Sequence, residues 1–381
     1  MRIAYVTETY PPEVNGVALT VQRCVRHMRR AGHSVLLVRP ALPGERSGRD
    51  AQEWRTHGMR IPMYPDLRMG LASAPALRRA LGDFAPELVH VATQGPLGRA
   101  AVAAARRLGV AVTSDFRTNF HVYCAHYGFA FARGLVMQYL RGFHNRTAAT
   151  FVPCRALQAE LQQQGLQRVE VMSRGVDARL FSPAHRRPQL RRLWNAADSA
   201  PVLLCVGRLA REKNVPLALR AFDAVLARRP DARMVVVGDG PLRRGLQAGH
   251  PHVHFVGVQR GSELAAHYAS ADVFLFPSLS ETFGNVTLEA LASGLAVVAF
   301  DVAAAGELIR DGRNGVLVRA GDGDAFEQAA CSAAGGDLGA IRARARQTAL
   351  ANDWEPVLHR FEMRLAELAQ PIEGFGHASL A

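Results

Sequence analysis

Short apolar runs alternate with longer amphipathic segments along this chain, and this alternation restricts the fold more than any other feature. The runs at 2–8, 33–40 and 87–93 are rich in Val, Leu, Ile and Ala, as expected of strands buried on both faces of a parallel sheet. Segment 18–32, between the first two runs, has the spacing of an amphipathic helix that ends at a glycine. This alternation predicts βαβ units and a doubly wound α/β fold.

The pattern is interrupted once and then starts again. Residues 182–201 are polar, rich in arginine and bounded by prolines, and we interpret them as a linker with a short helix. Further predicted strands lie on both sides of this segment, at 110–116, 150–154, 169–176, 201–207, 233–239, 253–257, 273–278, 295–300 and 315–322. We therefore expect two Rossmann-like domains, 1–185 and 186–353, and a C-terminal segment 354–381 whose helix packs back on the first domain.

Positive charge is concentrated in the first half of the chain. Residues 1–185 contain 24 Arg and 12 Asp plus Glu, a net charge of +12, whereas the rest of the chain carries +1. A one-sided basic surface favours an anionic partner such as a phospholipid leaflet or an acidic acceptor; the alternative is an arginine-rich composition that decorates surfaces at random. The sequence shows no nucleic-acid-binding motif, so we expect no nucleic-acid partner.

Cysteine content and hydropathy indicate a cytoplasmic protein. The five cysteines form no Cys-x-x-Cys pair, which predicts reduced thiols and no metal cluster. The N-terminal segment MRIAYVTETYPP has no signal-peptide hydrophobic region, and no run of eighteen apolar residues predicts a membrane span. Together with the charge asymmetry, this favours a protein that can attach peripherally to the inner face of the plasma membrane.

The single lysine of the chain lies directly after a predicted strand. The other 45 of the 46 Lys and Arg residues are arginine, and Lys213 stands in the segment GRLAREKN that follows strand 201–207. Arg208 and Lys213, both at a strand end, can converge on one phosphate group, and a retained lysine indicates a position suited to a compact ammonium. Exposed charges and chance retention are the alternative interpretation.

Two other loops carry weaker candidates. Asn15-Gly16 lies between the first strand and the first helix, where a glycine either lets backbone N–H groups approach an anion or makes a turn. Gly238 and Asp239 in VVVGDGP lie at another strand end, where they either contact a donor nucleobase or sugar or turn the chain. We include both loops among the candidates for donor binding.

The segment FLFPSLSETFGNVTLEALASG carries the strongest pattern. Glu281 lies in the loop after a strand, and Glu289 lies eight residues later in a helix that follows Gly284. Carboxylates at these positions can accept hydrogen bonds from sugar or ribose hydroxyls, while the helix N-terminus offers N–H groups to a phosphate. The alternative is one glutamate stabilised by the helix dipole and a second that faces solvent. The apolar neighbours of Glu289 argue against solvent exposure.

These segments, in this order, resemble the retaining GT-B glycosyltransferases of family four, the glycogen-synthase-like group that includes bacterial α-mannosyltransferases. The resemblance covers essentially the whole chain and rests on NGV, HVATQGPLG, SRGVD, VGRLAREKN, VGDGP and the E-x7-E motif from Glu281 to Glu289. It implies two Rossmann-like domains that face each other across a cleft. It also implies retaining transfer of a hexosyl unit from a nucleotide-sugar to a lipid or glycan acceptor at the cytosolic membrane face.

The segment ETFGNVTLEA resembles the corresponding segment of GDP-mannose-dependent α-mannosyltransferases, so we expect GDP-mannose as the donor and mannose as the transferred group. The alternatives are a UDP-sugar-dependent glucosyl or sulfoquinovosyl transferase and a nucleotide-sugar epimerase on the same fold.

The resemblance implies a role for each loop. Gly16 would place its backbone against the donor diphosphate, which Arg208 and Lys213 would neutralise. Glu281 would face the donor sugar, and Glu289 would hold the ribose. Three residues at the start of the helix would offer backbone amides to the sugar or phosphate: Phe283, Gly284 and Asn285. Neither a metal nor another cofactor would be required.

One segment departs from the family pattern. Where many relatives have a histidine in Ser-Tyr-His-Thr-Asn, this chain has Arg117 in Ser-Asp-Phe-Arg-Thr-Asn. We include Arg117 among the catalytic candidates, and Asn119, His121 and His126 as candidates on the acceptor side. The substitution points to a different sugar or an acidic acceptor.

Overall fold

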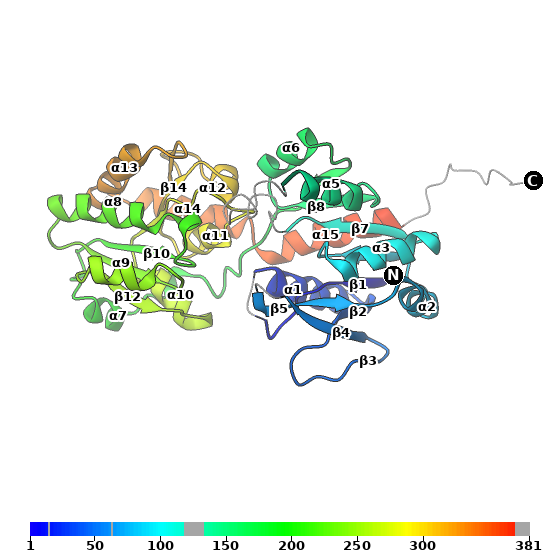
Figure 1. The fold of residues 1–381 in the computed structure, drawn as a ribbon. Coiled ribbons are helices and arrows are strands. Elements are labelled where there is room, and N and C mark those ends of the chain that lie inside the picture. Colours follow the sequence, from blue (N-terminus) through cyan, green and yellow to red (C-terminus); the bar gives the residue numbers. More distant parts are fainter. Residues whose placement is uncertain (14–15, 62–63, 118–132, 370–381) are drawn as a thin grey trace, which may run out of the picture. The chain divides into compact units, whose positions relative to one another are not determined.

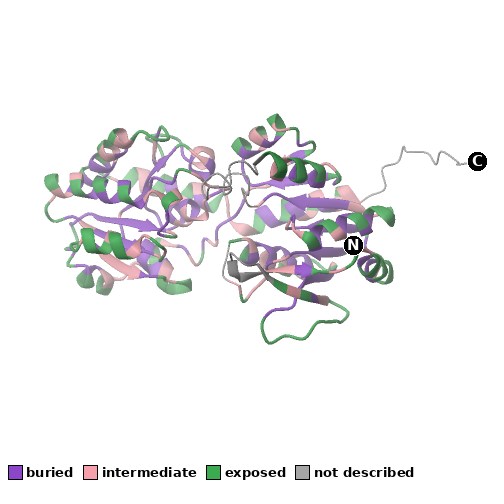
Figure 2. Cartoon of the chain, viewed as in Figure 1, coloured by how far each residue is buried: buried purple, intermediate pink, exposed green. Residues whose placement is uncertain are grey.

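The computed structural model describes residues 1–13, 16–61, 64–117 and 133–369. The chain divides into two compact units: unit 1 comprises Met1–Ser173 and the chain from Leu358, and unit 2 comprises Arg174–Val357. Each unit has helices around its own mostly parallel sheet (Figure 1). In both units the central parallel strands are buried, whereas β3 at the edge of the unit 1 sheet and the outer faces of the helices are exposed (Figure 2). The predicted doubly wound α/β fold is confirmed.

The sheet of unit 1 has the order β3-β4-β2-β1-β6-β7-β8-β9, with β5 paired to β4. Its strands are β1 (Arg2–Val6), β2 (Ser34–Pro40), β3 (Gly48–Arg49), β4 (Glu53–Ile61), β5 (Tyr64–Leu71), β6 (Leu88–Val91), β7 (Ala111–Asp115), β8 (Ala149–Val152) and β9 (Val169–Val171). All pairs are parallel except β3–β4 and β4–β5. The sequence analysis missed β3, β4 and β5, because β3 has only two residues and polar residues in β4 and β5 break the buried-strand pattern.

Helices cover both faces of this sheet. They are α1 (Gly16–Arg30), α2 (Ala74–Phe84), α3 (Pro96–Arg107), α5 (Arg133–His144), α6 (Arg155–Gln163) and most of α15 (Trp354–Ala369). α2 and α3 bury Leu77 and Leu97 against Val91 of β6. Because side chains alternate along a strand, His90 of β6 points to the opposite face, where its ring contacts Phe361 of α15.

Two histidines hold α15 on unit 1. Glu362 of α15 accepts hydrogen bonds from Nε2 of His27 in α1 and from Nε2 of His33, each at 2.8 Å. The amino group of Met1 lies 3.1 Å from Nδ1 of His33. Burial alone would raise the pKa of Glu362, but the hydrogen bonds from His33 and His27 outweigh burial and lower it. Glu362 therefore stabilises the folded chain in its ionised form.

The sheet of unit 2 is parallel and has the order β12-β11-β10-β13-β14-β15. Its strands are β10 (Val202–Val206), β11 (Arg233–Val237), β12 (His254–Gly257), β13 (Val273–Phe276), β14 (Ala296–Phe300) and β15 (Val316–Val318). Its α-helices are α7 (Pro188–Leu193), α8 (Val215–Arg228), α9 (Arg243–Gly249), α10 (Gly261–Ser270), α11 (Asn285–Ala292), α12 (Ala303–Leu308), α13 (Gly323–Gly335) and α14 (Gly339–Leu350), and its 3-10 turns are η2 (Pro183–His185) and η3 (Arg211–Lys213).

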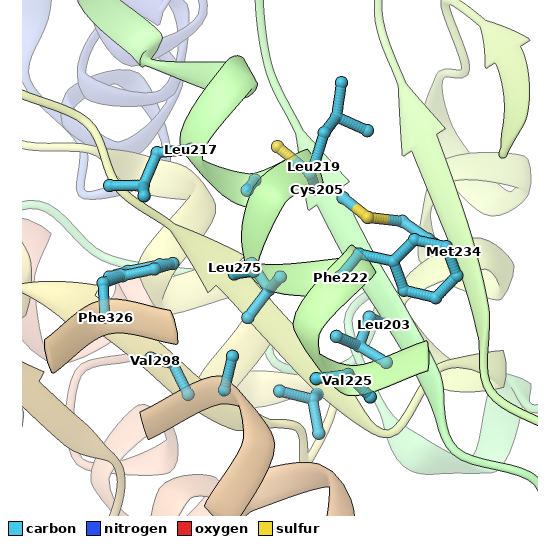
Figure 3. Packing of buried hydrophobic residues seen from close by; sticks show 14 of the residues in the cluster. Leu203, Cys205, Leu217, Leu219, Phe222, Val225, Met234, Leu275, Val298 and Phe326 are labelled. Atoms are coloured by element: carbon cyan, nitrogen blue, oxygen red, sulfur yellow. The ribbon is translucent and has the colours of Figure 1, made fainter. Parts of the chain in front are cut away.

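The core of unit 2 fixes α8 and α13 on one face of the sheet. Leu203 and Leu275 of the strands pack with Phe222 of α8 and Phe326 of α13 in one buried cluster (Figure 3). Burial of side chains of this size stabilises the fold by about 1.5–3 kcal/mol each. None of the helices in the described part of the chain is long and apolar enough to cross a membrane.

The interpretation of 182–201 as a linker is wrong, although its short helix is confirmed as α7. Arg191 of α7 is 2% exposed, and it donates to Oδ2 of Asp272 and to the carbonyl of Ala200. Arg346 donates to the carbonyls of Ala178 and Phe181, which binds that stretch to unit 2. The change of unit at Ser173 therefore precedes the expected boundary at 185. An arginine buried against carbonyl groups cannot be distinguished by sequence from an exposed one.

We expect the contribution of Glu362 to stability to depend on pH. Its folded-state pKa is lowered, so its stabilisation is present above the unfolded-state pKa and is lost as the pH falls through the folded-state pKa. Glu362→Gln should lower the free energy of unfolding by about 1–2 kcal/mol at neutral pH. Denaturant unfolding at a series of pH values should show this deficit shrinking below about pH 4.

The exposed His359 on the same helix provides the control, because His359→Gln should cost less at neutral pH. A deficit of Glu362→Gln that stays constant between neutral and acidic pH would contradict this assignment.

Candidate functional site

The strand order of unit 2 determines which loops meet. β10 and β13 are neighbours in the sheet, but β11 lies on the far side of β10, whereas β14 lies on the far side of β13. The chain thus leaves these two strands in opposite directions, and open α/β sheets bind ligands in the crevice expected beyond the carboxyl ends of such strands. Loop 207–214 after β10 and loop 277–284 after β13 therefore define the candidate site.

Lys213 and Glu281 form an ion pair at this point, in which Nζ donates to Oε1. The hydroxyl of Ser278 donates to the same carboxylate oxygen at 2.9 Å. The ammonium also lies 6.0 Å from the ring centroid of Phe276. The side chains of Lys213 and Glu281 are 23% and 10% exposed, so the pair is partly desolvated but accessible. The structure thus brings together two predicted site residues from different loops, and it adds Ser278.

Backbone contacts fix the two loops against each other. The N–H of Leu279 donates to the carbonyl of Glu212 at 3.0 Å, and the hydroxyl of Ser278 lies 3.2 Å from the same oxygen. Asn214 has a φ of 50° and connects η3 to the start of α8. The position of Lys213 therefore depends on hydrogen bonds from the second loop as well as on its own turn.

The first glycine of VVVGDGP is required by a close backbone approach. Gly238 has a φ of 136°, and a Cβ at this position would lie 1.9 Å from the carbonyl oxygen of Gly207. Asp239 accepts from the N–H of Gly240 and pairs with Arg243. These contacts show that Gly238 and Asp239 form a turn. Binding of the nucleotide-sugar by these two residues stays a prediction.

Arg208 lies in loop 207–214, directly after β10. Arg208 is exposed, and its guanidinium forms no ion pair with any residue that the structure describes. The N–H of the next residue, Leu209, donates to the carbonyl of Asp239 at 2.9 Å. Arg208 is thus anchored by its backbone, with a guanidinium that solvent or a ligand can reach.

The start of α11 provides the second half of the site. Gly284 precedes the helix with a φ of 89°. The carbonyl of Phe283 accepts from the N–H of Ala304, and its side chain is buried. The buried Oδ1 of Asn285 has no hydrogen-bond partner among the described residues. Unpaired buried acceptors are uncommon in folded proteins, and this one stands in the first turn of the helix that follows the Glu281 loop.

Glu289 is half-buried and bonds to another helix of unit 2, which argues against the alternative that it simply faces solvent. The hydroxyl of Tyr268, a fully buried residue of α10, donates to Oε2 of Glu289 at 3.0 Å. Burial raises the pKa of Tyr268 well above its usual value, and the Glu289 carboxylate raises it further. Sequence reasoning missed Tyr268, since a tyrosine within an apolar helix segment has the same pattern as a core residue.

In unit 1 the corresponding position lies beyond the carboxyl ends of the neighbouring strands β1 and β6. Gly16 begins α1 in the loop after β1. Glu8 in the same loop accepts from the backbone N–H of Leu97, at the start of α3, at 2.9 Å. Burial raises the pKa of Glu8 to about 7, although this hydrogen bond lowers it. A Cβ at Gly95 would overlap the Glu8 carboxylate, so the absence of a side chain at this position leaves room for Glu8. The sequence analysis did not single out Glu8.

Arg117 is held inside unit 1 by Asp115. Its guanidinium lies 2.5 Å from Oδ2 of Asp115, which also accepts from Nε2 of His90 at 3.0 Å. Burial alone would raise the pKa of Asp115, but Arg117 and His90 lower it. A substrate contact by Arg117 stays a prediction. The acceptor-side candidates lie outside the described residues: Asn119, His121 and His126.

Comparison with known proteins supports a single family over most of the chain. Residues 14–180 match the family described as Glycosyltransferase Family 4, and residues 200–334 match that described as Glycosyl transferases group 1. A GDP-mannose-dependent alpha-mannosyltransferase of Mycolicibacterium smegmatis is 38% identical over 94% of this chain and 95% of its own length. A GDP-mannose-dependent alpha-(1-6)-phosphatidylinositol monomannoside mannosyltransferase of the same organism is 29% identical over 97% of both chains.

A solved structure shares the fold. Sucrose-phosphate synthase from Thermosynechococcus elongatus superposes with a TM-score of 0.75 and 17% identity, over 96% of this chain and 98% of that one.

Proposed function

The chain belongs to glycosyltransferase family 4, and on that premise we propose that it transfers a mannosyl unit from GDP-mannose to a lipid or glycan acceptor. It is a retaining hexosyltransferase of the GT-B type. The observation that carries the choice of donor is the similarity, over nearly the whole chain, to GDP-mannose-dependent mannosyltransferases. The similarity to a mannosyltransferase that acts on a phosphatidylinositol mannoside supports a lipid acceptor.

We propose that the donor diphosphate binds at the crevice of unit 2. Glycosyl transfer develops positive charge on the sugar and negative charge on the departing diphosphate. Lys213 places a partly desolvated ammonium in this crevice, and the exposed guanidinium of Arg208 lies in the same loop. A diphosphate would compete with Glu281 for the Lys213 ammonium. Glu281 would then be free to accept a hydrogen bond from the sugar, while Ser278 keeps its carboxylate in place.

We propose that Glu289 holds the ribose. Tyr268 donates to Oε2 of Glu289 and thereby orients the carboxylate, whose two oxygens can together accept several hydrogen bonds, including those of ribose hydroxyls. The backbone N–H groups at the start of α11 would contribute to phosphate binding through the helix dipole.

We propose that this chemistry needs no metal ion, because Arg208, Lys213 and the α11 terminus supply the required positive potential. Residues 322–324 read Asp-Gly-Asp, a pair of carboxylates that could suggest a metal site, but the side chain of Asp322 has a structural role. Oδ1 of Asp322 accepts from the N–H of Ala325 and thereby caps α13.

The donor can be identified directly by a ligand screen. We expect GDP-mannose and GDP to raise the Tm of the purified protein, because a ligand that binds the folded state stabilises it by about 2.7 kcal/mol at a hundred times its Kd. Product analysis should then show free GDP and a mannosylated lipid. Stabilisation by UDP-sugars alone would overturn the choice of donor, and conversion of the nucleotide-sugar without any glycosylated acceptor would indicate an epimerase instead.

Substitution of the single lysine tests the charge model. Lys213→Ala should lower kcat/KM by about 10²–10³-fold, the effect of removing one preorganised charge donor. Lys213→Arg keeps the charge but replaces a compact ammonium by a planar guanidinium, and we expect a loss of about tenfold to a hundredfold. Arg211→Ala, which removes an exposed charge from the same 3-10 turn, is the matched control and should leave kcat/KM nearly unchanged. Wild-type activity of Lys213→Ala would refute the model.

We further propose that unit 1 binds an anionic membrane surface. A cavity of about 550 Å³ between α3 and α5 is lined by four arginines, none of which forms an ion pair with a described residue: Arg99, Arg106, Arg107 and Arg146. The described lining contains no acidic side chain. Tyr139 and Phe143 supply an apolar wall. Guanidinium groups bind phosphate oxygens in a bidentate manner, so this groove fits the headgroups of anionic phospholipids. The groove locates part of the positive charge that the sequence concentrates in its first half.

Vesicle binding tests the groove. Arg106→Gln/Arg107→Gln should weaken partition onto vesicles of phosphatidylglycerol and phosphatidylcholine by about tenfold or more, since each basic residue near an anionic surface contributes about 1 kcal/mol. Binding should also weaken as salt is added. Arg78→Gln/Arg79→Gln, an exposed arginine pair on α2, changes the net charge equally. Equal weakening by both double variants would show that net charge, and not the groove, drives binding.

A further inference from the structure

Three potential metal ligands meet on unit 2, away from the crevice described above. Asp223 belongs to α8, whereas His250 and His252 flank Pro251 between α9 and β12. Their ligand atoms all lie within 4.8 Å of one another. Nε2 of His252 is 3.3 Å from Oδ1 of Asp223, and Nδ1 of His250 is 4.0 Å from Oδ2 of the same carboxylate.

These distances approach those of a bound zinc ion. Ligand bonds of about 2.0–2.1 Å in a tetrahedral site place neighbouring ligand atoms about 3.4 Å apart. The His252–Asp223 distance already has this value, and small side-chain rotations would bring His250 to it. Two imidazoles and one carboxylate suit Zn²⁺, whereas Mg²⁺ and Ca²⁺ prefer oxygen ligands alone.

The surrounding structure holds the ligands in place. The ring of His252 stacks on that of Phe222, with centroids 5.8 Å apart and planes at 22°. Phe222 itself is anchored in the core of unit 2 (Figure 3). The N–H of His250 donates to the carbonyl of Leu246, and its own carbonyl accepts from the N–H of Val253. The histidine backbone is therefore fixed, which reduces the entropy lost when an ion binds.

A surface hydrogen bond between His252 and Asp223 would account for part of this arrangement, and such a pair contributes only about 0–1 kcal/mol to stability. It does not account for a second imidazole that faces the other oxygen of the same carboxylate. The nearby Arg220 pairs with Glu327, which directs its charge toward another acid and leaves Asp223 to the two histidines.

We propose that Asp223, His250 and His252 form a Zn²⁺ site, with water in the fourth position. The ion would join α8 to the turn before β12, which is the edge strand of the sheet. This turn lies at the amino-terminal edge of the strands, whereas Lys213 and Glu281 lie at the carboxyl-terminal edge. The site would therefore stabilise unit 2 without contacting the nucleotide-sugar. Sequence analysis did not predict it, since Asp223 is distant from both histidines along the chain.

Zinc titration of EDTA-treated, dialysed full-length protein tests this site. Calorimetry should give one saturable Zn²⁺ per chain, and Zn²⁺ should raise the Tm. His250→Ala, His252→Ala and Asp223→Asn should each weaken Zn²⁺ binding by about tenfold or more, because each removes a ligand. Co²⁺ bound to the wild type should show the visible absorption of tetrahedral coordination, and the variants should lose it.

His359→Ala is the matched control, since it removes an exposed histidine beside the carboxylate of Glu362 in unit 1. It should leave the Zn²⁺ affinity unchanged. Absence of saturable binding, equal affinity in the ligand variants and the wild type, or loss of binding in His359→Ala would each overturn the site.

The EDTA-treated protein separates this inference from the proposed metal-free transfer. We expect the stripped enzyme to keep its transferase activity while its Tm falls to that of His250→Ala. If stripping abolished transfer equally in the wild type and in His250→Ala, the metal-free mechanism would fail, while the zinc site would still be judged by its own binding data.

Discussion

The contact between Lys213 and Glu281 depends on the strand order of unit 2, and the proposed donor site depends on this contact. The two residues are 68 positions apart, and they meet because β10 and β13 are neighbours whose connections diverge. A partly desolvated ion pair requires additional hydrogen bonds to offset the loss of hydration. Ser278 supplies one to the carboxylate, and the Leu279–Glu212 bond ties the two loops together.

Both units use the same topological device with different chemistry. In unit 2, the loops beyond neighbouring strands bring a cation and a carboxylate together. In unit 1, the corresponding loops enclose Glu8, whose carboxylate accepts from the N–H of Leu97 at the start of α3. Burial outweighs the effect of this hydrogen bond, and the pKa of Glu8 rises to about 7. One crevice favours binding of an anion, and the other holds a carboxyl group that can change its protonation near neutral pH.

Arginine in this chain has more than one physical role, and its position decides which. Arg191 is buried and satisfies carbonyl groups, and Arg117 is the counter-ion of a buried carboxylate. Arg106 and Arg107 line an open groove without an ion pair to a described residue. The guanidinium can fill all these roles because it has five donors and stays charged when buried. The net charge of the sequence therefore exceeds the charge that is available to a partner.

The strands that are buried on both faces could be predicted from sequence, because continuous apolar runs bounded by turn residues seldom lie at a protein surface. Strands β3 to β5, which pair antiparallel with one another, could not, since the polar residues among them also fit loops. The E-x7-E motif marked Glu281 and Glu289 as candidates, because carboxylates at a helix start can accept hydrogen bonds from sugar or ribose hydroxyls, and their donor contacts stay a prediction. Ser278 and Tyr268 could not be predicted as site residues from sequence, because only the structure shows the carboxylate to which each hydroxyl donates a hydrogen bond.

The sequence by itself determined the fold class, the strands that are buried on both faces and the loops that carry the candidate residues, since these depend on local patterns of polarity. The tertiary structure decided which loops meet, which arginines are buried and which partner each glutamate has. These outcomes depend on the order of strands in the sheets, which residues far apart in sequence set jointly. The sequence shows that Lys213 is the single lysine of the chain. Its ion pair with Glu281 forms only because β10 and β13 are neighbours in the sheet.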